Sequence, residues 1–362
     1  MNTDNRKKKE LPRKAGGETL LLIALFCLTA ALTAMILLFL DGRKDLPEEA
    51  EPTSETLAAE ATDRGQASSP EGSVPYQVLP DVEALDISQM SPDELPAENS
   101  AADALEVEII QETEGEDKPY QTGWMTVNGN EYFVHDDGSY AFGLKQIGGK
   151  LYYFNQYAVK AKSLGVDVSY YNSDIDWDVV KAQGIDFVII RIGGRGWTSG
   201  LLYDDCRMRE YLRSARKAGL QLGAYFYSTA ITAYEAVEEA SVAVRTLDGI
   251  PLDLPLYIDM EFSGEYPKGR ADRLTPSERA GIATAFCETV RSSGYQPGVY
   301  AGQNFFKAYL DYNAVSRYNI WLASYTTNNE LPLFDKRYDL WQFTERGRVD
   351  GIRGIVDLNV IY

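Results

Sequence analysis

Short apolar runs and longer amphipathic stretches alternate along the chain from residue 164 onward. Short runs rich in Val, Ile, Tyr and Phe predict buried strands, whereas stretches with apolar residues three or four apart predict helices. The predicted strands are Leu164–Ser169, Phe187–Arg191, Gln221–Tyr227, Leu256–Glu261, Gly298–Tyr300, Ile320–Tyr325, Leu340–Phe343 and Ile355–Asn359. The predicted helices are Trp177–Gln183, Asp205–Ala218, Thr232–Leu247, Thr275–Ser293 and a short helix that ends at Leu310. This alternation predicts an α/β fold with a parallel sheet, and eight strands predict a closed barrel whose last helices are missing.

An uncharged apolar stretch of 22 residues, 19–40, follows a basic segment at 1–18. As a helix this stretch would be about 33 Å long, which is enough to cross a bilayer. We therefore predict a transmembrane helix at 19–40, with a cytoplasmic tail at 1–18 and the rest of the chain outside the cell. The alternative is a signal peptide cleaved near Ala30–Ala34, although such peptides usually have a shorter apolar core.

Residues 41–118 carry most of the acidity, with 22 acidic and four basic residues in a chain whose net charge is −19. This segment has almost no aromatic residues, so it lacks the apolar surface that a folded core needs, and its like charges repel. We predict a disordered acidic linker that spans roughly 50 Å on average. Residues 119–362 are nearly neutral, with 29 acidic and 25 basic residues. They show no sign of the basic face that binds nucleic acid.

An internal repeat of 20 residues follows the linker, within 119–160. Each unit carries a turn signal and then aromatic residues, a pattern that predicts a β-hairpin. The matching positions are Gly123-Trp124, Gly129 and Tyr132-Phe133 in the first unit, and Gly143-Leu144, Gly149 and Tyr152-Tyr153 in the second. The units resemble the choline-binding type of cell-wall repeat. Because only two units occur and Leu144 replaces the tryptophan, we expect a spacer or weak glycan contact and no complete choline pocket.

The histidine and cysteine content restricts the chemistry. The chain has one histidine, His135, which excludes a Ser-His-Asp triad or a paired-histidine metal site. Its three cysteines include no close pair, and Cys206 and Cys287 lie on two different predicted helices. We expect these two to be separate thiols, with a disulfide as the alternative.

Two acidic residues, Asp259 and Glu261, end an otherwise apolar predicted strand. Side chains two positions apart share a face of a strand, with Cα atoms roughly 6.5 Å apart. The two carboxylates repel and are costly to desolvate, so one should hold its proton to higher pH. A protonated carboxyl beside an ionised one is what cleavage of a glycosidic bond requires. The alternative is a strand end whose acids are solvated or salt-bridged.

Two further acids and six aromatic residues lie at matching strand ends. Asp167 ends the first predicted strand and Asp357 the last, and these strands are neighbours in a closed barrel. The four carboxylates should therefore converge on one mouth. The candidate aromatic residues for binding sugar rings are Tyr225, Tyr227, Tyr300, Trp321, Tyr325 and Trp341.

Several motifs together resemble glycoside hydrolase family 25, the bacterial and phage lysozymes (N-acetylmuramidases). The motifs are Gly165-Val-Asp-Val-Ser169, Ile175-Asp-Trp177, Phe187–Arg191, Gly223-Ala-Tyr225, Tyr257-Ile-Asp-Met-Glu261, Trp321-Leu-Ala-Ser-Tyr325, Trp341-Gln342 and Gly354-Ile-Val-Asp-Leu-Asn359. The resemblance implies an irregular, TIM-like (β/α)5(β)3 barrel, with a catalytic domain at 161–362.

The resemblance also implies roles for the four acids. Glu261 would be the general acid that protonates the leaving oxygen of the β-1,4 bond after N-acetylmuramic acid. Asp259 would stabilise the developing positive charge or orient the N-acetyl group, and Asp167 and Asp357 would anchor the site. No metal or other cofactor is implied, and inversion and substrate-assisted retention both stay open.

The implied partners are peptidoglycan glycan strands outside the cell and the membrane through the N-terminal helix. The alternatives are a catalytically silent peptidoglycan-binding surface protein on the same barrel, and a hydrolase of another amino-sugar polymer.

Overall fold

The computed structural model describes residues 85–86, 105, 107–110, 121–327 and 329–362, all within one compact unit, Val74–Tyr362. The predicted tail, the predicted transmembrane helix and most of the predicted linker lie outside the described residues. Within the described residues, none of the helices has both the length and the apolar character needed to span a bilayer.

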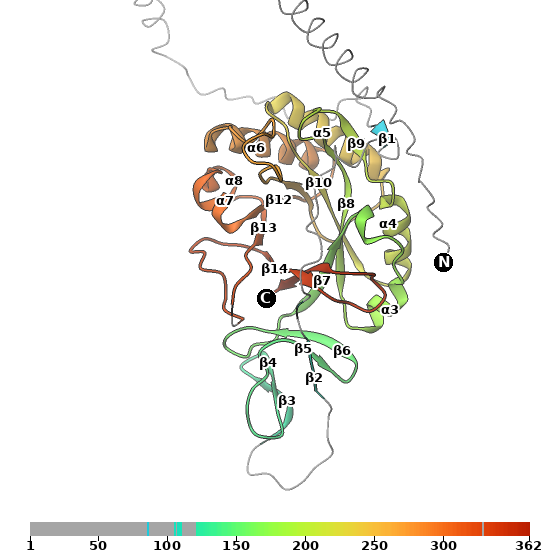
Figure 1. Ribbon diagram of the computed structural model, residues 1–362, viewed down its shortest axis with the longest axis vertical. Coiled ribbons are helices and arrows are strands. Elements are labelled where there is room, and N and C mark those ends of the chain that lie inside the picture. Colours follow the sequence, from blue (N-terminus) through green and yellow to red (C-terminus); the bar gives the residue numbers. More distant parts are fainter. Residues whose placement is uncertain (1–84, 87–104, 106, 111–120, 328) are drawn as a thin grey trace, which may run out of the picture. The chain divides into compact units, whose positions relative to one another are not determined.

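Eight strands form a closed barrel (Figure 1). In order around the barrel they are β7 (Ser163–Val168), β8 (Phe187–Arg195), β10 (Gln221–Tyr227), β11 (Leu256–Asp259), β12 (Pro297–Gly302), β13 (Asn319–Ala323), β14 (Leu340–Gly347) and β15 (Val356–Ile361). Neighbouring strands from β7 to β14 pair in parallel, and β7 also pairs with β15, which closes the ring. The predicted α/β barrel is confirmed.

The last strand differs from the prediction, because β15 runs antiparallel to both of its neighbours, β14 and β7. A parallel strand needs a long crossover connection that returns the chain to the starting end of the sheet. No helix occurs between β14 and β15 to provide that return, so the chain re-enters the barrel from the end at which β14 leaves it.

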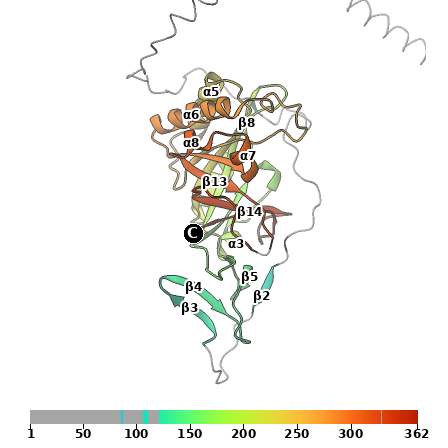
Figure 2. The ribbon, with the colours of Figure 1, turned by 90° about the vertical axis from the view of Figure 1, so that its left-hand side faces the viewer.

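Helices cover the outside of the parallel part of the barrel (Figures 1 and 2). They are α3 (Trp177–Ala182), α4 (Met208–Lys217), α5 (Ala233–Leu247), α6 (Pro276–Ser292), α7 (Gln303–Ala308) and α8 (Tyr312–Val315), with a 3-10 turn, η3 (Tyr170–Asn172), after β7. The start of α6 follows from its sequence. Thr275 accepts a hydrogen bond from the Glu278 backbone N–H and donates its own backbone N–H to the Glu278 side chain, which is a capping box.

Large side chains fill the inside of the barrel. Phe187, Tyr257 and Trp321 belong to one buried cluster there. Glycines make room for two of these rings, because a Cβ at Gly165 would lie 2.3 Å from the Phe187 ring and one at Gly298 would lie 2.3 Å from the Tyr257 ring. The barrel is therefore a packed core, and a substrate must bind at one of its ends.

The predicted repeats form two β-hairpins, called here the hairpin module. Its strands are β3 (Gly123–Val127), β4 (Asn130–Val134), β5 (Gly143–Ile147) and β6 (Lys150–Phe154). Both turns have two central residues with positive φ, Asn128-Gly129 and Gly148-Gly149, as tight hairpins require. Trp124 packs against Phe133 with ring centroids 5.3 Å apart, and against Tyr152 at 4.8 Å. These aromatic side chains thus form the core of the module.

Part of the segment predicted to be disordered is ordered. Glu108–Ile110 form strand β2, which pairs in parallel with β5, and Leu85–Asp86 form β1, which pairs with β9 (Leu202–Asp204). Ile110 packs against the core of the hairpin module, and Glu108 forms an ion pair of 2.9 Å with Lys145. The prediction of disorder is wrong for these two short strands. In β2 the cause is that the Ile110 side chain packs on the apolar core of the hairpin module while the backbone pairs with β5.

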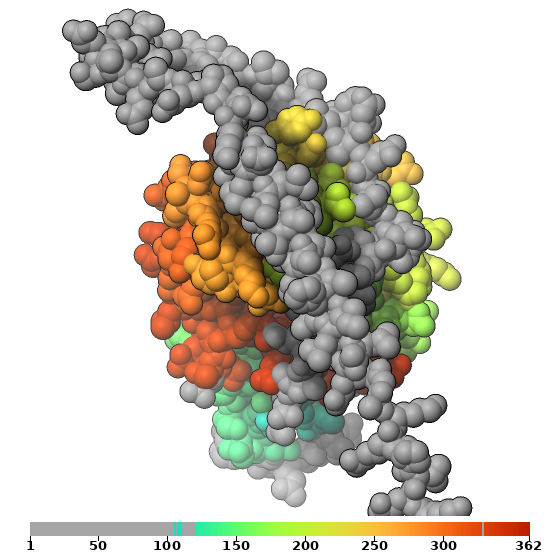
Figure 3. Space-filling view, turned by 45° about the horizontal axis from the view of Figure 1, so that its top comes forward, coloured from blue at the N-terminus to red at the C-terminus, as the bar shows by residue number. Residues whose placement is uncertain are grey.

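The hairpin module contacts the end of the barrel at which β7 begins (Figures 1, 2 and 3). The backbone N–H of Lys162 donates to the carbonyl of Ile361 at 2.8 Å, and that of Leu151 donates to Gln183 at 2.7 Å. Since β7 runs away from this end, its last residues reach the opposite end of the barrel.

Candidate active site

A cleft of about 220 Å³ opens at the end of the barrel where β7 and the other parallel strands finish. All four predicted carboxylates line it: Asp167, Asp259, Glu261 and Asp357. The predicted aromatic residues that line it are Tyr225, Tyr227, Tyr300, Trp321 and Tyr325. The cleft thus gathers the acids and the aromatic rings that the sequence placed at strand ends.

Asp259 and Glu261 occupy different depths of the cleft. Asp259 is the last residue of β11 and is 4% exposed, whereas Glu261 lies two residues beyond Asp259 and is exposed. Solvent reaches Glu261 through the open mouth, but protein atoms crowd its carboxyl on the other sides. Glu261 therefore meets an incoming substrate first, with Asp259 beneath it.

Enclosure and charge repulsion favour the protonated forms of both groups. Burial raises the pKa of Glu261 to about 7, and the charges of Asp167 and Glu345 act in the same direction. Burial raises the pKa of Asp259 well above its usual range, Glu261 and Asp167 raise it further, and Arg191 opposes the rise. The raised pKa of Glu261 has the direction that its predicted role as the proton donor requires. The raised pKa of Asp259 is opposite to the expectation that Asp259 carries the charge, because burial disfavours its ionised form.

Asp167 is buried at the centre of a polar cluster. Its Oδ2 accepts hydrogen bonds from Gln342 Nε2 at 2.9 Å and from Asn359 Nδ2 at 2.7 Å. Asp357 faces Asp167 across the β7–β15 pair and hydrogen-bonds to it through its side chain. Burial raises the pKa of Asp167, while these three hydrogen bonds lower it. The hydrogen bonds therefore stabilise the ionised form of Asp167 against the effect of burial.

The hydrogen-bond partners of Asn359 and Gln342 fix the orientation of both amides. Trp321 Nε1 can only donate, and it donates to Asn359 Oδ1 at 2.8 Å, so Asn359 Nδ2 must face Asp167. The hydroxyls of Tyr300 and Tyr325 both donate to Gln342 Oε1 at 2.9 Å, which directs Gln342 Nε2 to the same carboxylate. The aromatic side chains of the cleft thus fix the position of an acid.

Asp357 reaches the cleft in a way that the sequence did not predict. It is the second residue of β15, so it lies near the beginning of its strand and not at the end. Because β15 is antiparallel to β7, the start of β15 lies at the same end of the barrel as the finish of β7. The predicted meeting of Asp167 and Asp357 is therefore correct, although the predicted strand direction is wrong.

Five of the six predicted aromatic residues line the cleft, and they differ in how much surface they expose. Tyr325 is 50% exposed, and Tyr225 and Tyr300 are half-buried, so these three present surface to a ligand. Tyr227 and Trp321 are 3% and 1% exposed and support the cleft from behind.

Trp341 does not line the cleft, so its prediction as a binding residue is wrong. It packs outside the barrel wall, with its ring centroid 5.7 Å from that of Tyr153, and its Nε1 donates to the Ser324 carbonyl at 2.7 Å. Alternation along β14 explains this placement, because its neighbour Gln342 faces inward.

Three residues at the site were not among the predicted site residues: Arg191, Gln342 and Asn359. Each is a polar residue that is 3% exposed or less and has apolar residues on both sides of it in its strand. Gln342 and Asn359 lie opposite each other in the β14–β15 pair, and Asn359 has the same parity as Asp357. A buried polar side chain at an inward position is the signal that could have identified them.

Two further expectations concern cysteine and metals. No disulfide joins Cys206, which lies at the surface, to Cys287, which is buried in α6, in agreement with the expected separate thiols. Among the described residues, no group of three or more His, Cys, Asp or Glu side chains is arranged to hold a metal ion.

Comparisons with known proteins match the barrel. The model of glycosyl hydrolases family 25 matches residues 166–352, more than half of the 362 residues. The autolytic lysozyme of Clostridium acetobutylicum is 29% identical over 196 residues, covering 54% of each chain. The uncharacterised protein YegX of Escherichia coli K12 is 28% identical over 204 residues, covering 54% of this chain and 68% of YegX.

A solved structure has the same fold. The modular autolysin LytC of Streptococcus pneumoniae, in complex with a synthetic peptidoglycan ligand, superposes with a TM-score of 0.52 at 23% identity, covering 67% of this chain and 58% of LytC. The chain therefore spans little more than half the length of the lysozyme and of LytC. On the match of the family model to residues 166–352, the chain belongs to glycosyl hydrolases family 25.

Proposed function

We propose that this chain is a peptidoglycan hydrolase of the lysozyme type. It cleaves the β-1,4 bond between N-acetylmuramic acid and N-acetylglucosamine. The observation that carries the proposal is the accessible Glu261, whose pKa is raised to about 7 in a cleft that it shares with four other carboxyls. The similarity to an autolytic lysozyme supports this substrate.

Glu261 acts as the general acid. At neutral pH a substantial fraction of its carboxyl keeps its proton, because its pKa is raised to about 7. It donates that proton to the glycosidic oxygen as the bond from that oxygen to the anomeric carbon breaks. The released sugar leaves as an alcohol, and water supplies the hydroxyl of the new reducing end.

Asp259 lies below the reacting sugar and responds to positive charge. Its enclosure disfavours ionisation in the free enzyme, but a positive charge developing at the anomeric carbon favours its anionic form. Asp259 then stabilises that charge, or it orients the N-acetyl group that attacks the anomeric carbon. NMR observation of the first-formed product anomer distinguishes inversion from retention.

Asp167 and Asp357 anchor the floor of the cleft, and the exposed tyrosines bind sugar. The amide donors hold Asp167 in one orientation, and Asp357 lies opposite Asp167 in the β7–β15 pair. Tyr325 and Tyr225 offer flat faces at the mouth, which suit the apolar faces of sugar rings.

We also propose that the enzyme works outside the cell, anchored in the membrane by residues 19–40 through a tether formed by much of 41–118. The hairpin module acts as a spacer with at most weak glycan contact. Its aromatic residues form its own core, and Lys160 lies 5.8 Å above the Tyr152 ring while it pairs with Glu131 at 2.7 Å.

The test compares the full-length protein with Glu261→Gln on purified peptidoglycan, measuring new reducing ends and the masses of released muropeptides. Loss of a general acid should lower the rate by a factor of about 10² to 10⁴. Glu265→Gln, an exposed acid in an ion pair with Lys268, is the matched control and should keep the wild-type rate.

Wild-type rates in Glu261→Gln would contradict the assignment of the acid. Binding of peptidoglycan by the wild type without any reducing ends would favour the silent binding protein, and products of another mass would identify another polymer.

A further inference from the structure

A buried arginine lies at the base of the cleft. Arg191, on β8, is 3% exposed and lines the cleft beside Asp259. Its Nε donates to Asp205 Oδ2 at 3.0 Å, and its guanidinium carbon lies 5.1 Å and 5.3 Å from the ring centres of Tyr170 and Tyr171. An ion pair and two aromatic rings therefore fix the guanidinium in one position.

Three buried polar atoms in this region lack hydrogen-bond partners among the described residues. They are Arg191 Nη2, which can only donate, Asp259 Oδ1, and the Tyr203 hydroxyl, which can donate or accept and interacts with both residues. Folded proteins rarely leave such atoms unsatisfied, and Arg191 and Asp259 line the same cleft. The charge of Arg191 also opposes the rise in the pKa of Asp259, so the two side chains interact.

We propose that Arg191 is a positioning residue that orients Asp259 and stabilises its ionised form, with one bound water joining Nη2 to Asp259 Oδ1. This inference rests on the proposed hydrolytic function. Asp205 is part of the same arrangement, because its carboxylate accepts from Arg191 Nε and from the backbone N–H of Tyr170. A lysine could not hold Asp205 and direct a second donor toward Asp259 with the same geometry.

Most charged groups around Arg191 are carboxyls, so its positive charge has a large effect on their pKa values. Among the residues that line the cleft, the cations are Arg191 and Arg346, and Arg346 is exposed at the rim. The phenols of Tyr203 and Tyr225 also face Arg191. The carboxyls around it are Asp167, Asp205, Asp259, Glu261, Glu345 and Asp357. Removing one buried cation from this group should raise the pKa of both Asp259 and Glu261, since Arg191 lowers both.

The first experiment measures the pH dependence of hydrolysis by full-length protein carrying Arg191→Gln or Arg191→Lys. A bell-shaped profile reports the macroscopic pKa values of the essential carboxyls. In Arg191→Gln both limbs should move up by about one pH unit, and kcat at about pH 5 should fall about tenfold with KM nearly unchanged. Arg191→Lys keeps the charge, so its limbs should stay within about 0.3 unit of wild type while kcat falls.

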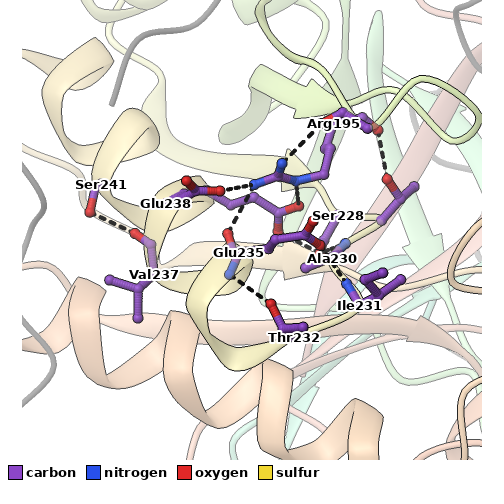
Figure 4. A network of polar contacts seen from close by, with 12 residues as sticks. Arg195, Ser228, Ala230, Ile231, Thr232, Glu235, Val237, Glu238 and Ser241 are labelled. Atoms are coloured by element: carbon purple, nitrogen blue, oxygen red, sulfur yellow. Dashed lines mark hydrogen bonds and ion pairs between the residues drawn. The ribbon is translucent and has the colours of Figure 1, made fainter. Parts of the chain in front are cut away.

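Arg195→Met is the matched control. Arg195 lies on the same strand and is similarly buried, but its Nε donates to Glu239 at 2.8 Å. Its Nη2 donates to Glu238 of α5 at 3.0 Å (Figure 4). Its replacement should lower thermal stability and leave the pH profile unmoved. An unmoved profile in Arg191→Gln, or an equal shift in Arg195→Met, would overturn the proposal.

A second measurement separates this inference from the proposed function. Carboxyl ¹³C chemical shifts of Asp259 and Glu261, followed against pH, report ionisation without any turnover, and their midpoints should rise by about one unit in Arg191→Gln. If the wild type is inactive but these midpoints rise, the hydrolase assignment fails and the role of Arg191 stands. Unchanged midpoints refute that role. If Arg191→Gln does not fold, Arg191→Lys provides the test, and a wild-type kcat in that variant refutes the proposed role of Arg191.

Discussion

Replacement of Asn359 by leucine tests the polar cluster around Asp167. Asn359 Nδ2 donates to Asp167 at 2.7 Å, and a hydrogen bond to a charged group contributes about 1.5–3 kcal/mol. The substitution also leaves Trp321 Nε1 without its acceptor at 2.8 Å, which costs about 1–3 kcal/mol for a buried donor. Leucine has the same branching and the same number of side-chain heavy atoms as asparagine and is the larger of the two, so we add no cavity cost. Asn359→Leu should therefore destabilise the protein by about 3–5 kcal/mol.

The double variant with Trp321→Phe makes the test specific. Phenylalanine removes the indole donor, so the unsatisfied group created by Asn359→Leu disappears. The double variant should therefore be about 1–3 kcal/mol more stable than the sum of the single effects predicts.

Urea unfolding of the full-length protein, followed by circular dichroism and extrapolated to water, measures each free energy of unfolding. The control cycle pairs Asn359→Leu with Trp177→Phe. Trp177 is a buried tryptophan on α3, and the effects of these two substitutions on the free energy of unfolding should add. Additivity within about 0.5 kcal/mol in the Trp321 cycle would show that the assigned amide orientation is wrong.

Three further outcomes can be measured. Burial raises the pKa of Glu239 from 4.5 to about 7 despite its ion pair with Arg195, so its contribution to stability is complete below about pH 4.5 and is lost as the pH rises through 7. Glu239→Gln should remove up to about 3 kcal/mol of that pH dependence in urea titrations at several pH values. Tyr325→Ala should raise KM several-fold, whereas Trp341→Phe should lower the unfolding temperature and leave KM unchanged, as initial rates will show. Gly165→Ala should cost about 2 kcal/mol or more in urea unfolding, because its Cβ would lie 2.3 Å from a buried ring.

The barrel strands could be predicted because they are buried on both faces and read as apolar runs. The prediction of Gln221–Tyr227 agrees with β10 at both ends. The short strand β9 and the four-residue helix α8 were missed, since such short elements carry no periodicity. The direction of β15 was also missed, because alternation of side chains looks the same in a parallel and an antiparallel strand.

The acids of the site could be recognised in the sequence, whereas the residues that hydrogen-bond to them could not. Asp259 and Glu261 are acidic residues at the end of an apolar run, and burying a charged side chain there is energetically costly. Gln342 and Asn359 matter through partners 175 and 192 positions away in the chain. The depth of Asp259 relative to Glu261 likewise depends on where β11 stops. Tertiary contacts decide these features, and local pattern does not contain them.

The hairpin module and the cleft lie at opposite ends of the barrel. A strand of five to six residues is roughly 17–20 Å long, so in the proposed hydrolase the scissile bond stands at least that far from any surface on which the hairpins rest. As a spacer, the hairpins set the height of the cleft above that surface. At that distance they do not touch the sugar that is cut, so discrimination between glycans falls to the residues that line the cleft.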